Sequence, residues 1–385
     1  MADHSLQLGS STAASNQEIL NYDQLAEVFS YLPAKNLCRL HLVSKSLHHM
    51  ITSDRLFHLT QSYHNAAAAA IIVETCFRLQ FFILDPDAGL PPRASLDILS
   101  SCRILCSAGG LIFYLIKDTL FYSICAYNPV RRESWLIRIP PDGDIGPRSS
   151  LAVEFTNNVA GDYKLVFLTT DEDWSNYRFR VYDSAAQVWT RDEMINNGGR
   201  NLKFENPVVH QGAVFWASDC VSWFTTVDPY VLSYEIATGV VEFLAMPELD
   251  DGAVEWIDNI SVAVWEESWL CLMHCRQRTG TFTAWGRSGD SWVKLNEFVH
   301  LEKPKRSVGT RWYATMLVCD GGKEKGMILV FSVNGEAYVY SFRQKDLTRL
   351  PTRPGPCFPT FFAYANTLRP ACGTTDRRKP IRLLT

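Results

Sequence analysis

The eleven cysteines of this sequence are the residues best suited to bind a metal or to form covalent links. Two pairs, Cys102/Cys106 and Cys271/Cys275, are each four positions apart within apolar, strand-like runs. Neither pair has the two-residue spacing or the nearby histidines of a zinc site. Residues i and i+4 of a strand face the same side, so the members of each pair can be neighbours in a core. The odd total argues against a complete disulfide framework, and we predict buried free thiols and no metal site.

Histidines and glycine-rich loops, the other usual carriers of chemistry, do not form the pattern of an active site. Five of the nine histidines fall between positions 41 and 64, and the other four are dispersed. The sequence contains no Gly-x-Ser-x-Gly and no His-Glu-x-x-His motif. Residues 321–326 have a glycine spacing similar to that of a phosphate-binding loop, but Met327 occupies the lysine position, so we expect a turn. The protein is therefore predicted not to be an enzyme and to need no cofactor.

Composition and charge argue against several classes of partner. The chain of 385 residues carries 37 Lys and Arg against 41 Asp and Glu, a net charge of −4 with both signs interspersed. This balance argues against a nucleic-acid groove or an anionic membrane surface. Residues 1–18 do not resemble a secretory signal, and the most apolar stretch, 66–73, is far shorter than the roughly 20 residues of a membrane span. We expect a soluble intracellular protein of the cytoplasm or nucleus, in which the basic cluster 377–379 is a solvated tail or a weak nuclear import signal.

The elements that could position functional groups begin with a helical segment between residues 20 and 60. One face of its first helix is apolar at positions i, i+3, i+4 and i+7: Leu25, Val28, Phe29 and Leu32. Asn21 or Asp23 can cap the start of this helix, and Pro33 predicts a corner before the next one. A second apolar stripe follows, consisting of Leu37, Leu40, Leu42 or Val43, Leu47 and Ile51. So small a unit has more apolar residues than it can bury within itself, so it needs a partner protein or packs on its own neighbouring domain.

These residues resemble an F-box, a family pattern that joins two Leu-Pro pairs, a helix with a carboxylate, and a helix with an Arg–Val-Ser-Lys stretch. The matching positions are Leu20, Leu25, Glu27, Val28, Leu32, Pro33, Leu37, Arg39, Leu40, Val43, Ser44 and Lys45. Asn21 stands where proline is usual, and Leu47 stands where an aromatic residue is more common. These two departures from the family pattern predict that the affinity for the protein to which an F-box docks is weaker than usual.

From about residue 70 onward, short apolar runs separated by Gly, Pro, Asn and Asp predict β-strands. Five copies of a two-part unit recur there, each starting with a short apolar strand, at 110–115, 163–168, 212–216, 269–273 and 327–331. Each copy continues with an aromatic residue, a polar turn and a second large apolar residue: Tyr127/Trp135, Tyr182/Trp189, Tyr234/Phe243, Trp285/Trp292 and Tyr340/Leu350. A period near fifty is about the length of one four-stranded propeller blade. The aromatic pair can pack across its hairpin and against the neighbouring blade.

A single blade cannot bury both of its faces, so the copies are expected to stack in a ring. Segments 69–84 and 358–364 supply strand material outside the five copies, and we predict that they share a sixth blade that closes the ring. With the helices, this layout is similar to the plant-type F-box proteins that carry a kelch-like, F-box-associated β-propeller. The expected fold class is α plus all-β multidomain, with six blades and with five or seven as alternatives. The expected parts are a disordered tail (1–18), the F-box (19–62), the propeller (66–368) and a basic tail (369–385).

The resemblance implies a substrate-recognition subunit of a Skp–cullin–F-box ubiquitin ligase, which positions a protein substrate for ubiquitin-dependent degradation. The F-box would bind a Skp-type adaptor, and through it a cullin–RING ligase. The candidate adaptor contacts, some of which must instead hold the helices together, are Leu20, Leu25, Val28, Leu32, Pro33, Leu37, Leu40 and Val43. Aromatic residues of the longer loops are candidate substrate contacts: Trp174, Tyr177, Trp223, Phe224 and Trp256. The alternatives are an interaction protein outside a ligase, such as a transcriptional co-regulator, and a propeller enzyme.

Overall fold

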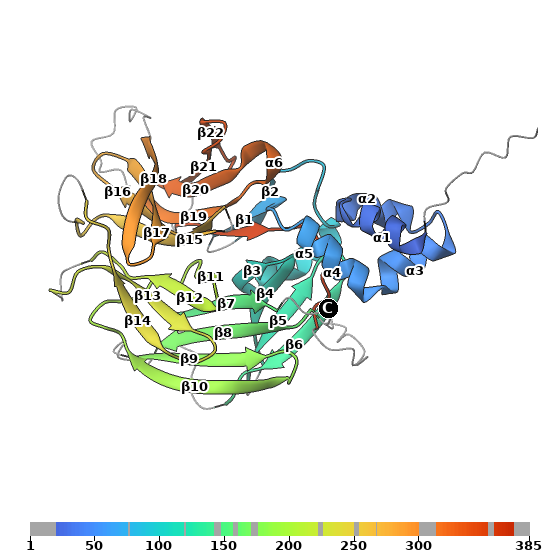
Figure 1. The fold of residues 1–385 in the computed structure, drawn as a ribbon, viewed down its shortest axis with the longest axis horizontal. Helices are drawn as coiled ribbons and strands as arrows, with labels where there is room; N and C mark the ends of the chain where they lie inside the picture. The colour runs from blue at the N-terminus through green and yellow to red at the C-terminus, as the bar shows by residue number, and fades with distance from the viewer. Residues whose placement is uncertain are drawn as a thin grey trace, which may run out of the picture.

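A computed structural model shows four short helices packed against one end of a ring of β-sheets (Figure 1). The structure describes residues 21–75, 78–118, 121–141, 148–156, 161–170, 176–221, 226–249, 254–266, 268–299, 313–352 and 358–372. The ring consists of six sheets, the blades of a β-propeller. The predicted fold class, short helices followed by a six-bladed propeller, is therefore confirmed.

The N-terminal unit contains α1 (Tyr22–Ser30), α2 (Ala34–Leu40), α3 (Lys45–Ser53) and α4 (Arg55–His64). Asn21 caps α1, since its side chain accepts from the Gln24 amide while the Gln24 side chain accepts from the Asn21 amide. Pro33 directly precedes α2, at the predicted corner. The second apolar stripe is split between α2 and α3, because Ser44 starts a new helix by accepting from the Leu47 amide. The turn between α2 and α3 consequently contains Val43, which the sequence placed on a continuous stripe.

Five blades contain four antiparallel strands each, arranged in sequence order across the sheet. Blade 1 consists of β3 (Arg103–Ala108), β4 (Leu111–Lys117), β5 (Tyr122–Asn128) and β6 (Glu133–Arg138). Blade 2 consists of β7 (Ser149–Phe155), β8 (Tyr163–Thr170), β9 (Asn176–Asp183) and β10 (Val188–Asn196). Blade 3 consists of β11 (Val208–His210), β12 (Ala213–Ala217), β13 (Tyr230–Glu235) and β14 (Val241–Ala245).

The last two complete blades have the same layout. Blade 4 consists of β15 (Asn259–Trp265), β16 (Trp269–Arg276), β17 (Thr281–Ser288) and β18 (Ser291–Val299). Blade 5 consists of β19 (Tyr313–Asp320), β20 (Met327–Val333), β21 (Glu336–Ser341) and β22 (Asp346–Arg349). Short helices α5 (Arg93–Asp97) and η1 (Ile98–Ser101) precede blade 1. The segment that is similar to a phosphate-binding loop contains the four-residue helix α6 (Gly322–Lys325), which connects β19 to β20 within one hairpin.

The sixth blade joins the two ends of the propeller. Its strands β1 (Ala70–Thr75) and β2 (Arg78–Ile83) come before blade 1, and β23 (Thr360–Tyr364) comes after blade 5. β23 pairs antiparallel with β1, placing Tyr364 opposite Ala70 and Thr360 opposite Glu74. The first strands of the five complete blades and β23 contact one another in a closed ring around the central channel. The prediction that segments from both ends share one closing blade is confirmed.

Six apolar clusters fill the spaces between neighbouring blades, one for each pair. Between blades 2 and 3, for example, the Phe179 ring of β9 stacks on the Tyr234 ring of β13 with centroids 4.7 Å apart. Between blades 4 and 5, Phe282 and Phe331 lie 4.6 Å apart. Each blade therefore buries its two faces only with the help of both neighbours.

The repeated unit seen in the sequence is the outer part of a blade. Its apolar run forms the second strand of each complete blade, and its pair of large side chains belongs to the third and fourth strands, except that Leu350 directly follows β22. In blade 2 the rings of Tyr182 and Trp189 lie 5.4 Å apart across the hairpin. The Trp189 indole N–H donates to the Arg138 carbonyl of blade 1 at 2.8 Å, and the Trp292 indole N–H donates to the Ala245 carbonyl of blade 3 at 2.8 Å. These tryptophans therefore link blade 2 to blade 1 and blade 4 to blade 3.

The two cysteine pairs have different environments. Cys271 and Cys275 are both fully buried in the cluster between blades 4 and 5, as expected for i and i+4 of a strand. Burial raises the pKa of the Cys271 thiol to about 12, so this thiol stays protonated. Cys102 and Cys106 pack into different clusters, and the expectation that they are neighbours is wrong. Cys102 precedes β3, and a bulge between Ile104 and Cys106 breaks the strand alternation.

Candidate functional site

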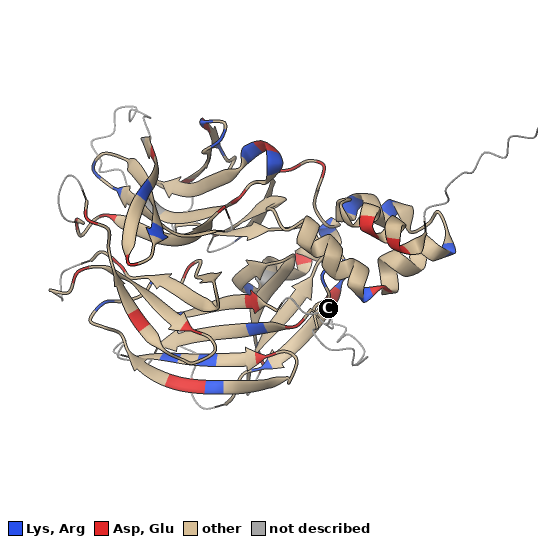
Figure 2. Ribbon diagram, viewed as in Figure 1, with Lys and Arg blue, Asp and Glu red and all other residues tan. Residues whose placement is uncertain are grey.

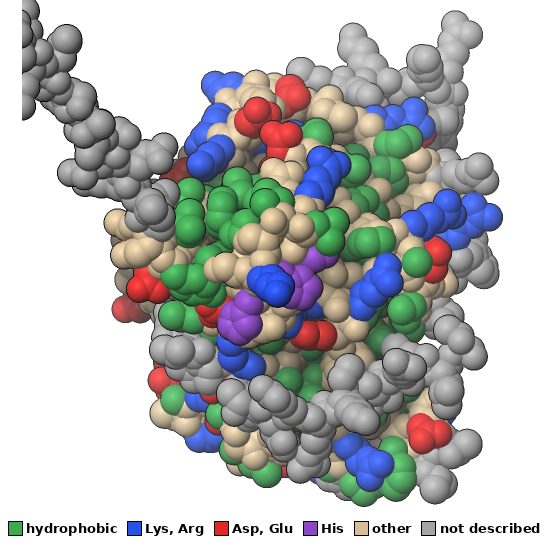
Figure 3. Space-filling model, turned by 90° about the vertical axis from the view of Figure 1, so that its right-hand side faces the viewer, with side chains coloured by type: hydrophobic (Ala, Val, Ile, Leu, Met, Phe, Trp, Pro, Cys, Tyr) green, Lys and Arg blue, Asp and Glu red, His purple; other side chains and the backbone are tan. Residues whose placement is uncertain are grey.

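Apolar side chains are exposed on the helices, at the end of the molecule that faces the viewer in Figure 3. Val28 of α1 is 56% exposed, and Leu42 and Val43 in the turn after α2 are 80% and 68% exposed. Tyr31 follows α1, where its ring stacks on His64 at 3.8 Å and still keeps much of its surface in contact with solvent. Hydrophobic side chains that gather on one face of a protein are typical of a surface that binds another protein.

The predicted adaptor contacts divide into exposed and buried residues. Only Val28 and Val43 are exposed, and Leu20 lies outside the described residues. Leu37 is fully buried, and three others are half-buried in the same apolar cluster, which we call the helix core: Leu25, Leu32 and Leu40. Pro33 is half-buried at the corner before α2. The sequence did not predict Tyr31 as a surface residue of this kind. It predicted Leu42 only as the alternative to Val43 in the second apolar stripe.

A polar network centred on His58 joins the helices to the propeller. The fully buried His58 ring places Nε2 at 2.8 Å from the Ile51 carbonyl and Nδ1 at 2.9 Å from the Arg131 guanidinium. The guanidinium lies 2.9 Å from Nε2 as well, but the Ile51 carbonyl can only accept, so Nε2 carries the proton and Nδ1 is the ring nitrogen that accepts from Arg131. Arg131, in the turn between β5 and β6, also pairs with Glu133 at 2.6 Å. Burial, and then the Arg131 charge, lower the pKa of His58 to about 3, so the ring is neutral near pH 7.

The segment that follows β23 forms a second link, which we call the C-terminal strap (residues 365–372). Leu368 is buried in the helix core, and its amide donates to the Gln61 side chain at 2.9 Å. Ala371 lies in the cluster between blades 1 and 2, where its carbonyl accepts from the Tyr163 hydroxyl at 3.0 Å. Arg55 of α4 donates to the Cys372 carbonyl at 2.8 Å. Part of the segment predicted as a basic tail, 369–372, therefore packs against the propeller and the helices.

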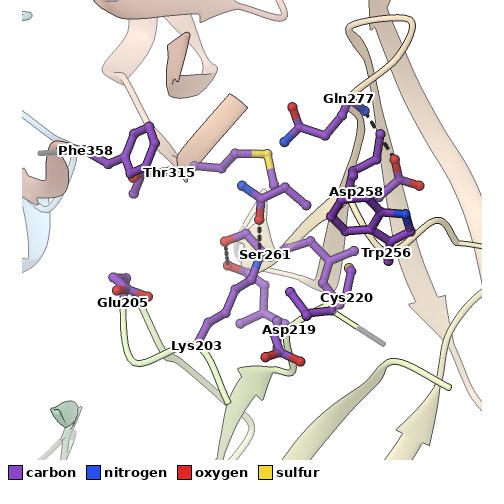
Figure 4. Close-up of a pocket in the computed structure, with 17 residues that line it drawn as sticks. Lys203, Glu205, Asp219, Cys220, Trp256, Asp258, Ser261, Gln277, Thr315 and Phe358 are labelled. Atoms are coloured by element: carbon purple, nitrogen blue, oxygen red, sulfur yellow. Dashed lines mark hydrogen bonds between the residues drawn. The ribbon is translucent and has the colours of Figure 1, made fainter. Parts of the chain in front are cut away.

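A pocket of about 450 Å³ opens at the opposite end of the propeller channel (Figure 4). Blades 3, 4 and 5 supply its walls, and Phe358, two residues before β23, completes it. β23 begins beside this pocket and leads at its other end to Leu368 in the helix core. Gly161, two residues before β8, lies so close to Leu59 of α4 that a side chain there would collide with it. The helices and the pocket are therefore on opposite faces of the propeller.

Most charged groups of the pocket are already engaged within the protein. The Lys203 ammonium donates to the Asn259 side chain and, at 2.9 Å, to the Ile260 carbonyl, and burial lowers its pKa. The buried Asp258 carboxylate lies 3.1 Å from His274 Nε2 and accepts from two backbone amides. Burial tends to raise the pKa of Asp258, but the hydrogen bonds from His274 and the amides outweigh it, and the pKa is lowered. These groups hold the wall in place.

The predicted substrate contacts have three different outcomes. Trp256 lines the pocket and is 44% exposed. Tyr177 is fully buried in β9, where its hydroxyl accepts from the Leu202 amide at 2.6 Å, so the expectation that it is an exposed loop residue is wrong. Three candidates lie outside the described residues: Trp174, Trp223 and Phe224. Sequence reasoning missed Phe358 and Glu205, which line the same pocket, because each stands next to a strand far from Trp256 in the sequence.

The charged residues that the structure describes do not concentrate on one part of the molecule. Figure 2 shows Lys, Arg, Asp and Glu dispersed over helices and blades, without a face of one sign. Within the described ranges, no group of three or more His, Cys, Asp or Glu side chains is arranged to hold a metal ion. None of the helices that the structure describes is long and apolar enough to cross a bilayer.

Known proteins match the two parts of the chain separately and together. The F-box associated beta propeller domain matches residues 92–368, and the F-box-like domain matches residues 22–59. The F-box protein CPR1 of Arabidopsis thaliana is 23% identical over 364 residues, which cover 87% of this chain and 84% of that protein. Among solved structures, TolB from Acinetobacter baumannii has a TM-score of 0.47 and 14% identity, covering 80% of this chain and 72% of TolB. The propeller match alone extends over more than half of the chain, and the protein therefore belongs to the F-box associated beta propeller family, with an F-box-like domain at its helices.

Proposed function

We propose that this protein is the substrate-recognition subunit of a Skp–cullin–F-box type ubiquitin ligase. The observation that carries the proposal is the exposure of Val28, Leu42 and Val43 on an F-box-like unit that has its own apolar core. An exposed apolar surface of this kind favours a permanent protein partner. A Skp-type adaptor is the partner that F-box membership favours, and a cullin–RING ligase would follow it into the complex.

In this role the protein acts by position and makes or breaks no covalent bond itself. The helices are joined to the propeller through His58 and Leu368, so a substrate held by the blades would stay at a fixed place relative to the adaptor. Such tethering raises the effective concentration of substrate lysines near the ubiquitin-conjugating enzyme. The complex would act in the cytoplasm or the nucleus.

The test is co-purification of the full chain with a Skp-type adaptor, comparing wild type with the Val28→Asp/Val43→Asp variant. Both residues are exposed, so the change leaves the helix core intact. A carboxylate placed in an apolar interface costs several kcal/mol, so we expect the apparent Kd for the adaptor to rise by about 100-fold or more. Leu32→Asp is a poorer choice, because Leu32 packs in the helix core and its loss would unfold the unit.

Val188→Asp is the matched control, since Val188 is 51% exposed on β10 at the outer edge of blade 2. It should bind the adaptor as wild type does. Equal adaptor binding by the Val28→Asp/Val43→Asp variant and the wild type would contradict the proposal. Adaptor binding without cullin in the complex would instead support an interaction protein outside a ligase, such as a transcriptional co-regulator.

A further inference from the structure

The pocket of Figure 4 lies on the face of the propeller opposite the helices, so a substrate bound there would not contact them. It lies where the first strands of blades 3, 4 and 5 begin, and the segment before β23 joins them there. Its volume of about 450 Å³ falls within the range of sites that enclose a small ligand or a large side chain. The pocket is therefore large enough to hold one anchoring side chain of a protein.

Two aromatic side chains flank this pocket from different parts of the chain. Trp256 is 44% exposed and Phe358 is 54% exposed, and Figure 4 shows them on opposite sides of the space. Met316 and Val262 also line the pocket with apolar side chains. Exposed aromatic residues at a concave site are the usual anchors of protein recognition, because they bury a large area at a small cost in side-chain entropy. This arrangement favours a large apolar side chain as the inserted group.

Glu205 adds a negative charge to the pocket, whose other charged side chains are already engaged within the protein. It is exposed at the pocket, and in the described part of the chain its carboxylate forms no direct hydrogen bond or ion pair and acts on Lys203 and Arg103 only through its charge. Lys203, the basic side chain of the pocket, already donates to Asn259 and Ile260, and Asp258 is held by His274. The Glu205 carboxylate is consequently the anionic group that remains available to a ligand. It suits a lysine or arginine of a bound segment.

We propose that this pocket is the substrate-recognition site of the propeller, and that it binds a protein segment through two residues. A large apolar side chain of the segment enters between Trp256 and Phe358, and a lysine or arginine next to it pairs with Glu205. The inference rests on the proposed function, since it names the kind of segment that the ligase subunit would hold. A pocket on the face opposite the helices leaves the adaptor surface free while substrate is bound.

The test uses a phage-displayed library of random dodecapeptides, selected on the immobilised full-length chain. We expect the enriched peptides to share an aromatic or large aliphatic residue within two positions of a lysine or arginine. The enriched consensus, made as a fluorescent synthetic peptide, should bind the Trp256→Ala/Phe358→Ala variant about tenfold or more weakly than wild type. Selection on Glu205→Lys should replace the basic neighbour with Asp or Glu, which a merely structural role of Glu205 would not produce.

Two matched variants serve as controls, Trp269→Ala and Glu324→Lys. Trp269 is the first residue of β16, beside the end of β15, and Glu324 is exposed on α6, after the end of β19. The pocket is lined by residues at the opposite ends of β15 and β19, so both control positions lie away from it. Both variants should keep the wild-type peptide affinity. No enrichment on wild type, an acidic consensus, or a consensus unchanged by Glu205→Lys would overturn the proposal.

Adaptor co-purification of the same variants separates this proposal from the proposed function. The pocket variants should bind a Skp-type adaptor as wild type does. Peptide binding without adaptor binding would count against the ligase role alone. Adaptor binding without pocket-dependent peptide selection would count against the pocket alone.

Discussion

The pKa of the His58 side chain is lower in the folded protein than in the unfolded chain. Its pKa falls from the ordinary 6.5 to about 3 on folding, because the ring is buried and faces Arg131. Between these two values the unfolded state binds a proton that the folded state does not, so stability decreases as the pH falls. The stabilisation is complete above pH 6.5 and is lost progressively below it.

This behaviour predicts an acid sensitivity that a single substitution removes. Between pH 7 and pH 5, wild type should lose about 2 kcal/mol more free energy of unfolding than His58→Gln, which cannot be protonated. Urea unfolding at the two pH values, followed by tryptophan fluorescence, measures the difference. His48→Gln, at an exposed position of α3, is the matched control and should show the wild-type pH dependence. Equal pH dependence of wild type and His58→Gln would show that His58 is not held neutral.

At the scale of elements, the C-terminal strap is a short irregular segment that connects two units with separate cores. Leu368 lies in the helix core, while Ala371 lies in the cluster between blades 1 and 2. Its backbone also accepts from Arg55 of α4 and Tyr163 of β8. The strap thus joins both ends of α4, through Arg55 and Gln61, to the blades.

Leu368→Asp should release the helices from the propeller. A carboxylate in an apolar core costs several kcal/mol, which exceeds what a few hydrogen bonds between the two parts can offset. We expect the amides of α4 to exchange hydrogen at least about tenfold faster, while those of blades 3 and 4 stay protected. Leu368→Met keeps the apolar contact and should exchange as wild type does. Unchanged protection of α4 in Leu368→Asp would mean that other contacts alone hold the helices.

At the scale of the whole molecule, closure of the ring depends on one five-residue strand. β23 pairs with β1 and contacts the first strands of both neighbouring blades, β3 and β19. Without β23, the backbone edge of β1 is unpaired, and the two apolar clusters on either side of the sixth blade lose the side chains that β23 contributes. An open ring leaves unpaired strand edges, which favour aggregation.

Deletion of residues 359–385 should therefore destabilise the entire propeller. We expect a fall in Tm of about 10 °C or more, or insoluble protein, because several buried aromatic contacts are lost together. Circular dichroism during heating and size-exclusion chromatography make the measurement. Deletion of residues 373–385 alone keeps β23 and the strap and should change the Tm little. The same Tm for both truncations would contradict a closure that depends on β23.

The sequence by itself determined the parts of this protein that depend on local order. Hydrophobic period, an Asn21 cap and Pro33 predict the helices, because these signals act within one or two turns of the chain. A repeat near fifty residues plus strand material at both ends predicts a ring of six blades with five or seven as alternatives, since each copy must cover its faces with a neighbour, and the structure settles the number at six. The family pattern of residues 22–59 was visible for the same reason.

Only the tertiary structure decided which apolar residues face outward. Val28 and Leu32 belong to one predicted stripe, yet Val28 of α1 is exposed, while Leu32, in the chain after the end of α1 at Ser30, packs in the helix core. Leu368 enters that core from more than 300 positions away in the sequence. The pocket likewise combines Glu205, Trp256 and Phe358 from separate blades. Such contacts come from the closure of the ring, and no local pattern of residues encodes them.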